Sequence, residues 1–322
     1  MLIAVIGATG RQGGGVIDAV HESSYGLAVR AVVRDARAPK ATALKARVAQ
    51  IVEADLDDVR SLRAAFRGAD GAYCVTPPDA DDQAGRETVR AQNMAAAARD
   101  ARLEHVVWST QEDTRPVLAA AGSGMPVLGG RFRVPSYDAK AEADAAFRDL
   151  GVPTTFMRTS FYWESLFLPY VGPRSTPEGG AVIRWPLGDA TLPGIAVADI
   201  GRCAVGLFAQ RSTYVGRTVG VCGEQLTGLE IATALGKALG MGCRYEPIDP
   251  EKFRRLPFRS AAAIANTFQY KRDFAHAHGQ YRDVALSRSL NPELRTFRQW
   301  LAEKWTSLAW KRLGHALEAE RR

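Results

Sequence analysis

A glycine-rich turn near the start of the sequence most constrains the fold. Leu2 to Ile6 is an apolar run rich in β-branched residues, and Gly7-Ala8-Thr9-Gly10-Arg11-Gln12-Gly13 follows it before helical spacing begins at Val16. Glycines in such a strand, turn and helix permit unusual backbone angles, close approach to a pyrophosphate and tight packing of helix on strand. N–H groups at the helix start can then hold phosphates. The pattern predicts dinucleotide binding by Gly7, Thr9, Gly10, Arg11, Gln12 and Gly13. Its spacing is GxxGxxG rather than the GxGxxG of the commonest dinucleotide fingerprint, and a plain turn is the alternative.

The pattern of the following residues predicts a doubly wound α/β fold. Apolar runs at 27–33, 48–53, 71–75, 105–108 and 154–158 predict strands, and helical spacing falls at 59–66, 89–101 and 137–150. Strands that alternate with helices in this way form a parallel sheet with helices on both faces. We therefore predict a nucleotide-binding domain over 1–158 and a smaller lobe over 159–322 that covers the ligand edge, with the chain crossing between the two.

The end of the second predicted strand decides the choice of cofactor. In dinucleotide-binding folds a carboxylate at this point pairs with the ribose 2′-hydroxyl of NAD, whereas an arginine accommodates the 2′-phosphate of NADP. Arg34 closes the strand, and Arg37 and Lys40 follow in the same loop, so the sequence favours NADP. Asp35 is the counterargument, because its carboxylate could take the ribose hydroxyl.

Two more strand ends provide candidate binding residues. Asp55 and Leu56 follow the third strand, and Thr76 and Pro77 follow the fourth. Ligands bind beyond the carboxyl ends of the strands in open α/β sheets, so we expect these residues near the cofactor. Either pair could also be an ordinary connection between elements.

A tyrosine and a lysine near the start of the helix at 137–150 could carry chemistry. Ser109, or Thr110, ends the fifth strand, a long glycine-containing loop is predicted over 111–134, and Tyr137 precedes Lys140 by about one turn. A phenol must exchange a proton near neutrality to act as an acid, and a neighbouring ammonium favours its phenolate. We predict Ser109, Tyr137 and Lys140 as the catalytic set, with Lys140 also binding the nicotinamide ribose. A packed tyrosine and a solvated lysine are the alternative.

Composition and charge exclude several classes of protein. With 322 residues and 46% apolar content the chain can bury a large core, and no apolar run is long enough for a membrane helix. The first strand begins at residue 2, so we expect a cytoplasmic protein without a leader. Four cysteines without a CxxC pair indicate buried thiols, and no metal site is predicted.

The C-terminal region carries the basic excess. Residues 252–322 hold 15 Lys and Arg against 6 Asp and Glu, a net charge of +9, while the remaining chain has a net charge of −2. A solvated basic face is one explanation and an acidic protein partner is another; without a known binding motif, direct nucleic-acid binding is disfavoured. A helix predicted over 292–313, with Asn291 as its cap, would pack one apolar face onto the protein. That face contains Leu294, Phe297, Leu301, Trp305 and Leu308, and Trp300 and Trp310 lie off it, so a membrane surface or a homo-oligomer contact stays open.

Several of these segments together resemble the NmrA-like family, an atypical branch of the short-chain dehydrogenase/reductase superfamily. They are the glycine turn, the Arg34 strand end, Tyr137-Asp138-Ala139-Lys140, Phe161-Tyr162-Trp163-Glu164 and Phe297-Arg298-Gln299-Trp300-Leu301. The resemblance spans nearly the whole chain. It implies an NADP-preferring Rossmann domain with a small C-terminal lobe, in a family that includes redox sensors and regulators beside reductases of quinones and other carbonyls.

The spacing of the tyrosine and the lysine departs from the superfamily pattern. The usual motif is YxxxK, whereas Tyr137 and Lys140 are spaced YxxK and Ser136 stands four residues before the lysine. One missing residue rotates the phenol by about 100° around a helix. The sequence therefore favours an NADP-binding redox sensor or regulator, and an NADPH-dependent reductase of quinones or other carbonyls is the alternative.

Overall fold

The computed structural model describes residues 1–77 and 84–305, which form two compact units. Unit 1 contains Met1–Thr159, Val197–Val221 and Arg288–Pro292. Unit 2 contains Ser160–Ala196, Cys222–Ser287 and the chain from Glu293 onward. The chain therefore returns to unit 1 twice after first leaving it.

A parallel sheet of seven strands organises unit 1, in the order β11-β6-β5-β4-β1-β2-β3. The strands are β1 (Leu2–Ile6), β2 (Ala28–Val33), β3 (Gln50–Glu53), β4 (Gly71–Cys74), β5 (His105–Thr110), β6 (Thr154–Arg158) and β11 (Thr218–Gly220). The strand order reverses between β1 and β4, which is where open α/β sheets bind ligands. The predicted doubly wound α/β fold is confirmed.

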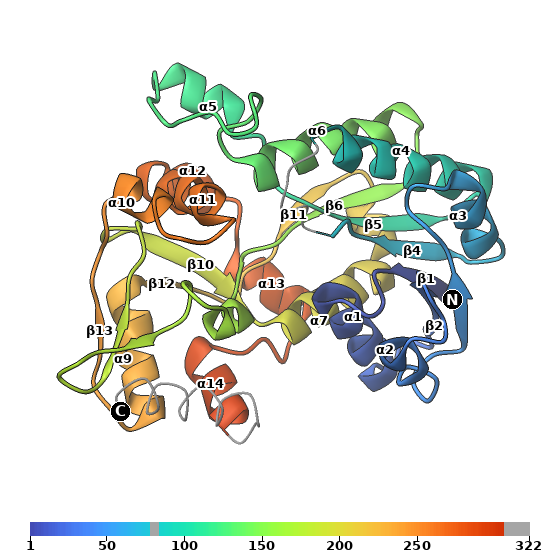
Figure 1. Ribbon diagram of the computed structural model, residues 1–322. Coiled ribbons are helices and arrows are strands. Elements are labelled where there is room, and N and C mark those ends of the chain that lie inside the picture. The colour runs from blue at the N-terminus through green and yellow to red at the C-terminus, as the bar shows by residue number, and fades with distance from the viewer. Residues whose placement is uncertain (78–83, 306–322) are drawn as a thin grey trace. The chain divides into compact units, whose positions relative to one another are not determined.

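Helices cover both faces of this sheet (Figure 1). One face carries α1 (Arg11–Glu22) and α7 (Val197–Ala209), and the other carries α3 (Val59–Phe66), α4 (Ala84–Asp100) and α6 (Pro135–Asp149). Helices α1 and α7 approach closely at two glycines, since a Cβ on Gly201 would lie 2.1 Å from the Gly15 carbonyl oxygen. The shorter helices of unit 1 are α2 (Pro39–Thr42) and α8 (Arg211–Tyr214). Helix α13 (Val284–Leu290) begins in unit 2 and ends in unit 1.

The segment predicted as a long loop is partly helical. Helix α5 (Arg115–Ala120) lies within 111–134, and Leu118 and Phe132 are buried there. A short bridge also pairs Leu128 with Phe132. The sequence did not indicate this helix, because six residues are too few to establish a helical spacing of apolar side chains.

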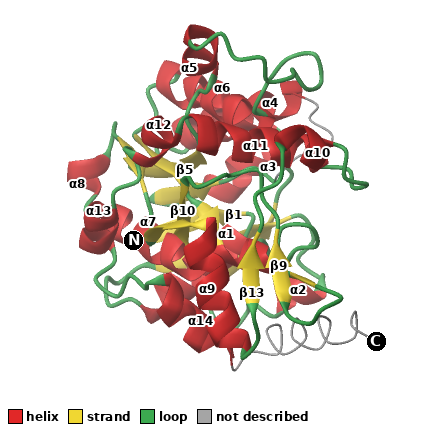
Figure 2. Cartoon of the chain, turned by 90° about the vertical axis from the view of Figure 1, so that its left-hand side faces the viewer, coloured by secondary structure: helices red, strands yellow, loops and turns green. Residues whose placement is uncertain are grey.

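Two small sheets and several helices make up unit 2. One sheet contains β7 (Phe161–Tyr162), β10 (Thr191–Ile195) and β12 (Glu224–Thr227), and the other contains β8 (Arg174–Ser175), β9 (Ala181–Ile183) and β13 (Cys243–Tyr245). Figure 2 shows β9 and β13 side by side. The helices are the 3-10 helix η1 (Trp163–Phe167), α9 (Gly228–Leu239), α10 (Pro250–Arg254), α11 (Ala261–Asp273), α12 (Ala275–Gly279) and α14 (Phe297–Trp305).

The last helix begins later than predicted. Helix α14 starts at Phe297, because Thr296 and Gln299 cap each other. The Gln299 backbone N–H donates to the Thr296 hydroxyl, and the Thr296 backbone N–H donates to the side-chain amide oxygen of Gln299. Asn291 does not cap the helix, since its amide donates to Asp199 at 3.1 Å. Leu294 precedes the helix, and the predicted part beyond residue 305, with Leu308 and Trp310, lies outside the described residues.

The aromatic residues after β6 belong to the core of unit 2. Phe161 and Trp163 are buried, and the Trp163 ring packs against Phe297 and Trp300. Trp300 is itself fully buried and donates to Glu164 at 3.1 Å, so its predicted position off the buried face is wrong. Phe161 and Trp163 therefore serve core packing in unit 2.

The basic C-terminal region is not simply a solvated face. Lys271 is buried over the rings of Phe161 and Phe268, at 5.7 and 5.6 Å from their centres, and Arg282 is fully buried. The Arg282 guanidinium donates to the His278 carbonyl oxygen at 2.8 Å. Part of the positive charge therefore serves packing within unit 2, where cation–π contacts and hydrogen bonds compensate for burial.

All four cysteines are free thiols, and burial raises the pKa of Cys222 to about 11. Within the described ranges there is no cluster of His, Cys, Asp and Glu that could hold a metal ion. Over those same ranges, none of the helices combines the length and apolar character needed to span a bilayer.

A buried histidine in β5 makes folding sensitive to acid. His105 is fully buried, and its Nε2 lies 2.8 Å from the Thr155 hydroxyl, which itself donates to the Tyr214 carbonyl oxygen. Nε2 therefore carries the proton, and Nδ1 has no hydrogen-bond partner among the described residues. Burial lowers the pKa of His105 from 6.5 to about 4, because the charged ring would lose its hydration.

We expect His105→Gln to reduce the loss of stability in mild acid. The unfolded chain binds a proton below pH about 6.5 and the folded chain does not until about 4, so the histidine costs up to about 3 kcal/mol as pH falls across this window. A glutamine amide can keep the hydrogen bond to Thr155 without titrating. Urea unfolding at several pH values measures how steeply the free energy of unfolding changes with pH. His21→Gln, at an exposed histidine, should leave this slope unchanged. Equal slopes for His105→Gln and the unmodified protein would contradict the assignment.

Candidate dinucleotide site

The glycine turn after β1 exposes the start of α1. Gly7 adopts a left-handed conformation with φ of 65°, and the Gly10 N–H donates to its carbonyl oxygen at 2.8 Å. Helix α1 begins at Arg11, and no side chain caps its first N–H groups. Thr9 and Arg11 are exposed beside them. A helix start that lacks a side-chain cap can bind a phosphate group.

The backbone of the glycine turn packs closely against the start of α1, as in turns that bind a dinucleotide. A Cβ on Gly13 would lie 2.3 Å from the Gly7 carbonyl oxygen, which no side chain could tolerate. Gln12 is anchored to the neighbouring strand, since its side-chain oxygen accepts a hydrogen bond from the Tyr73 hydroxyl. Val75, after β4, lies 3.3 Å from a Cβ placed on Gly7, so the ends of β1 and β4 meet at this turn. The residues present therefore fit a pyrophosphate held against the backbone.

The loop after β2 carries exposed basic side chains and a carboxylate that is hydrogen-bonded within the loop. Arg34, Arg37 and Lys40 are exposed, and their side chains make no hydrogen bond or ion pair with the described residues. Asp35, by contrast, accepts a hydrogen bond from the Arg37 N–H at 2.8 Å. The carboxylate thus stabilises its own turn, while the guanidinium groups are available to a phosphate.

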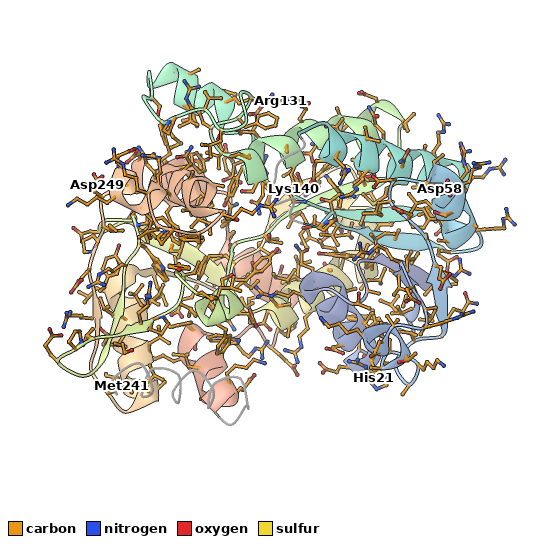
Figure 3. All side chains as sticks on the ribbon, in the orientation of Figure 1. His21, Asp58, Arg131, Lys140, Met241 and Asp249 are labelled. Carbon is orange, nitrogen blue, oxygen red and sulfur yellow. The ribbon has the colours of Figure 1, made fainter. Side chains whose placement is uncertain are left out.

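The residues after β3 are engaged in their own connection. Asp55 accepts from the Asp57 N–H at 2.9 Å, and the Leu56 carbonyl oxygen accepts from the Asn93 amide at 2.9 Å. These contacts shape the loop that leads to α3, whose N-cap is Asp58 (Figure 3). For Asp55 and Leu56 a role in binding remains a prediction. Pro77 is the last residue described before the gap at 78–83.

Lys140 on α6 forms a small polar cluster with Thr76 and Glu87. Its Nζ donates to the Thr76 hydroxyl at 2.7 Å and to the Glu87 carboxylate at 3.0 Å (Figure 3 labels the lysine). The Thr76 hydroxyl in turn donates to the same carboxylate oxygen of Glu87. The side chains of Lys140 and Glu87 are only 17% and 12% exposed, so this ion pair is largely shielded from water.

Trp108 of β5 makes a cation–π contact with Lys140. The Lys140 ammonium lies 5.3 Å from the centre of the Trp108 ring, and the indole N–H donates to Asp144 at 2.8 Å. Burial raises the pKa of Asp144 to about 6, against the hydrogen bonds from Thr110 and Trp108 that lower it. When ionised, Asp144 polarises the indole and strengthens its attraction for the cation.

The other two predicted catalytic residues, Ser109 and Tyr137, are not hydrogen-bonded to Lys140. The hydrogen bonds of Lys140 to the described residues go to Thr76 and Glu87, and neither Ser109 nor Tyr137 is among them. Ser109 is buried at the end of β5, and Tyr137 is buried in the first turn of α6. The structure thus unites Lys140 with Thr76, two residues predicted separately. Their roles toward a cofactor remain predictions.

Sequence reasoning missed Glu87 and the role of Trp108. Glu87 is an acidic residue in the first turn of a helix, where a surface position is the ordinary expectation. No local sequence signal marks Glu87, because Glu87, Thr76 and Lys140 come from three separate segments that only the fold brings together.

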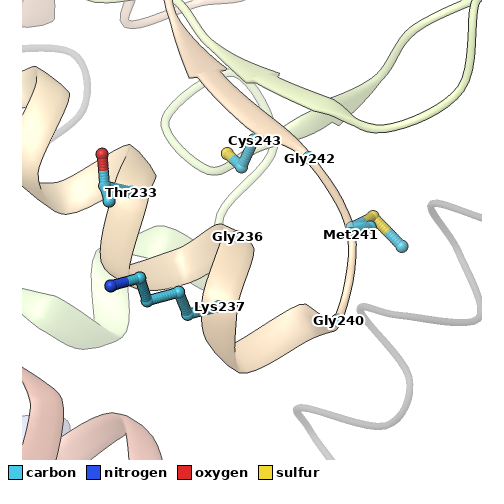
Figure 4. A pocket seen from close by; sticks show the side chains of 7 residues that line it. All are labelled: Thr233, Gly236, Lys237, Gly240, Met241, Gly242 and Cys243. Carbon is cyan, nitrogen blue, oxygen red and sulfur yellow. The ribbon is translucent and has the colours of Figure 1, made fainter.

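A shallow depression in unit 2 contains none of these residues. It has a volume of about 530 Å³ and is lined by Thr233, Gly236, Lys237, Gly240, Met241, Gly242 and Cys243 at the end of α9 (Figure 4). Glycines supply three of these seven residues, and no ion pair or buried carboxylate lies among them. The residues that fit a dinucleotide belong to unit 1.

The fold and the glycine turn define an NAD(P)-binding protein of the Rossmann class. The family model of the NmrA-like family matches residues 1–309. The chain therefore belongs to the NmrA-like family, as the sequence motifs indicated.

Individual relatives include enzymes and a regulator. The chain is 30% identical over 255 residues to an NAD(P)H azoreductase of Xenophilus azovorans, covering 79% of each protein. The negative transcriptional regulator NmrA, solved with NAD and with NADP, matches with TM-scores of 0.76 and 0.74 at 23% and 22% identity, covering 97% of this chain and 96% of that one. The NADPH complex of quinone oxidoreductase QOR2 from Escherichia coli matches with a TM-score of 0.71 at 19% identity, covering 95% of this chain and 100% of that chain.

Proposed function

We propose that this protein is an NADP(H)-dependent reductase of conjugated acceptors such as quinones or azo compounds. One observation carries the proposal: a lysine ammonium is held in a shielded cluster on α6 together with Thr76, which directly follows the strand end that meets the glycine turn. A cofactor bound at the turn would extend along the same edge of the sheet. The 30% identity to an NAD(P)H azoreductase supports this class of reaction.

Each part of the candidate site has a separate task in cofactor binding. The start of α1 would hold the pyrophosphate, and Arg34, with Arg37 and Lys40 nearby, would hold the 2′-phosphate. Lys140 would donate to the nicotinamide ribose. When bound, the cofactor supplies a hydride, and the residues of the chain orient it.

The choice of acceptor class rests on the position of Tyr137, the predicted proton donor. Tyr137 is displaced in spacing from the superfamily position and is buried, so it is poorly suited to protonate a substrate. A quinone or azo group delocalises the charge that a hydride brings, so its reduction depends less on a positioned acid. The name of QOR2 as a quinone oxidoreductase agrees with this choice.

A redox-sensing regulator is the second candidate. The spacing of Tyr137 and Lys140 favours it, as does the fold shared with the regulator NmrA. The net charge of +9 on residues 252–322 would suit an acidic protein partner. NADPH oxidation measured against a panel of quinones, azo dyes and aldehydes separates the candidates. Tight NADP(H) binding without turnover of any acceptor would reject the reductase and favour the regulator.

We expect Arg34→Ala to weaken NADP binding about ten- to a hundredfold and to leave NAD binding nearly unchanged. Charge-assisted hydrogen bonds contribute about 1.5 to 3 kcal/mol, and only NADP offers the 2′-phosphate. Calorimetry with both cofactors measures the difference. Arg60→Ala is the matched control, since Arg60 is an exposed arginine on α3. Equal losses for the two cofactors would refute the assignment of Arg34.

A further inference from the structure

The Lys140 ammonium already donates hydrogen bonds within the protein before any ligand binds. An ammonium carries three N–H bonds, and two of them are directed at Thr76 and Glu87. The face of the Trp108 ring bounds the group on another side. One N–H is therefore left, and the neighbouring groups restrict the directions in which it can point.

Glu87 is the residue that completes this arrangement. Its carboxylate oxygen accepts from both Lys140 and Thr76, so the three groups form a closed triangle. The geometry ties together the segment that follows β4, the first turn of α4 and the second turn of α6. A long, flexible lysine side chain would otherwise sample many rotamers, and ordering it only on binding would lower affinity.

We infer that Glu87 is a positioning residue that orients Lys140 toward the bound cofactor, through the Thr76–Glu87–Lys140 triangle. This inference rests on the proposed binding of NADP(H) and goes beyond it, because it assigns a role to a residue that need not touch the cofactor. Glu87 acts on binding through the lysine alone. Its removal should therefore matter only while the lysine is present.

A double-mutant cycle tests this dependence. Glu87→Gln keeps an oxygen that can accept from Thr76 and removes the charge that holds Lys140. We expect it to weaken NADPH binding about tenfold, within the range for charge-assisted hydrogen bonds. In the background of Lys140→Met the same change should alter NADPH binding by less than about twofold. Titration calorimetry gives the four dissociation constants, and thermal melting without cofactor confirms that each variant is folded.

A second carboxylate on α6 provides the control. Glu142 pairs with Arg115 and Arg131, so Glu142→Gln removes the same charge two residues from Lys140 without touching it. We expect this variant to bind NADPH as the unmodified protein does. Thr76→Val, which removes the hydroxyl at similar size, should weaken binding in the same lysine-dependent way as Glu87→Gln.

The outcomes separate this inference from the proposed function. Equal losses from Glu87→Gln with and without Lys140, or a similar loss from Glu142→Gln, would overturn the positioning role while NADPH binding by the unmodified protein upholds the cofactor assignment. Failure of the unmodified protein to bind NADPH would overturn both. A loss confined to the background that contains Lys140 supports the inference.

Discussion

Lys140→Met should weaken NADPH binding about ten- to a hundredfold and lower turnover of a quinone at least as much. The change removes an ammonium that would donate to the ribose, an interaction of about 1.5 to 3 kcal/mol. It also leaves the Glu87 carboxylate, only 12% exposed, without its ion-pair partner. Loss of one member of a buried pair costs about 3 to 5 kcal/mol at full burial, so we expect a clear drop in melting temperature as well.

Tyr137→Phe is the companion variant, and we expect it to change binding and turnover by less than about threefold. The hydroxyl of Tyr137 has no role in the proposed reaction, because YxxK spacing turns the side chain away from the usual donor position. Steady-state kinetics and calorimetry on both variants measure the contrast. Normal binding by Tyr137→Phe with turnover reduced by a factor of about 10² to 10⁴ would show that the phenol is a general acid. That result would restore Ser109, Tyr137 and Lys140 as the catalytic set.

Gly13→Ala should abolish tight NADP(H) binding and destabilise unit 1. The new Cβ would lie 2.3 Å from the oxygen and 2.6 Å from the carbon of the Gly7 carbonyl group, and both are backbone atoms that cannot rotate away. The turn that would hold the pyrophosphate must therefore move. Overpacking of this kind costs about 1 to 3 kcal/mol, occasionally more. Urea unfolding gives the stability change, and calorimetry gives the loss of affinity.

The next glycine in the same helix offers a matched control. A Cβ on Gly14 would have only the Ala8 carbonyl oxygen nearby, at 3.9 Å, which is an ordinary contact. Gly14→Ala should therefore keep NADP(H) binding and raise stability by about 0.5 to 1 kcal/mol, because alanine is the better helix former. Similar losses from both substitutions would mean that the helix start, rather than close packing at Gly13, limits binding.

Local patterns determined much of unit 1 from the sequence alone. The continuous apolar strands, the glycines between β1 and α1 and the helical spacing of 59–66 depend on neighbours in the chain, so they were readable directly, and the sheet and family are confirmed. The YxxK spacing of Tyr137 and Lys140 is also a local feature that can be read directly from the sequence. Short elements such as α5 were missed, since six residues carry too little periodicity.

Side-chain partners between distant segments were decided only by the tertiary structure. Asn291 looked like a helix cap, but its amide pairs with Asp199, 92 residues away, and Thr296 takes the capping role. Lys140 was predicted from its place after the fifth strand, whereas its partner Glu87 lies 53 residues earlier in the chain and has no local feature that marks it. A sequence specifies such a pair only through the packing of α4 and α6 on the sheet, because hydrogen bonds select neighbours in space and not neighbours in the chain.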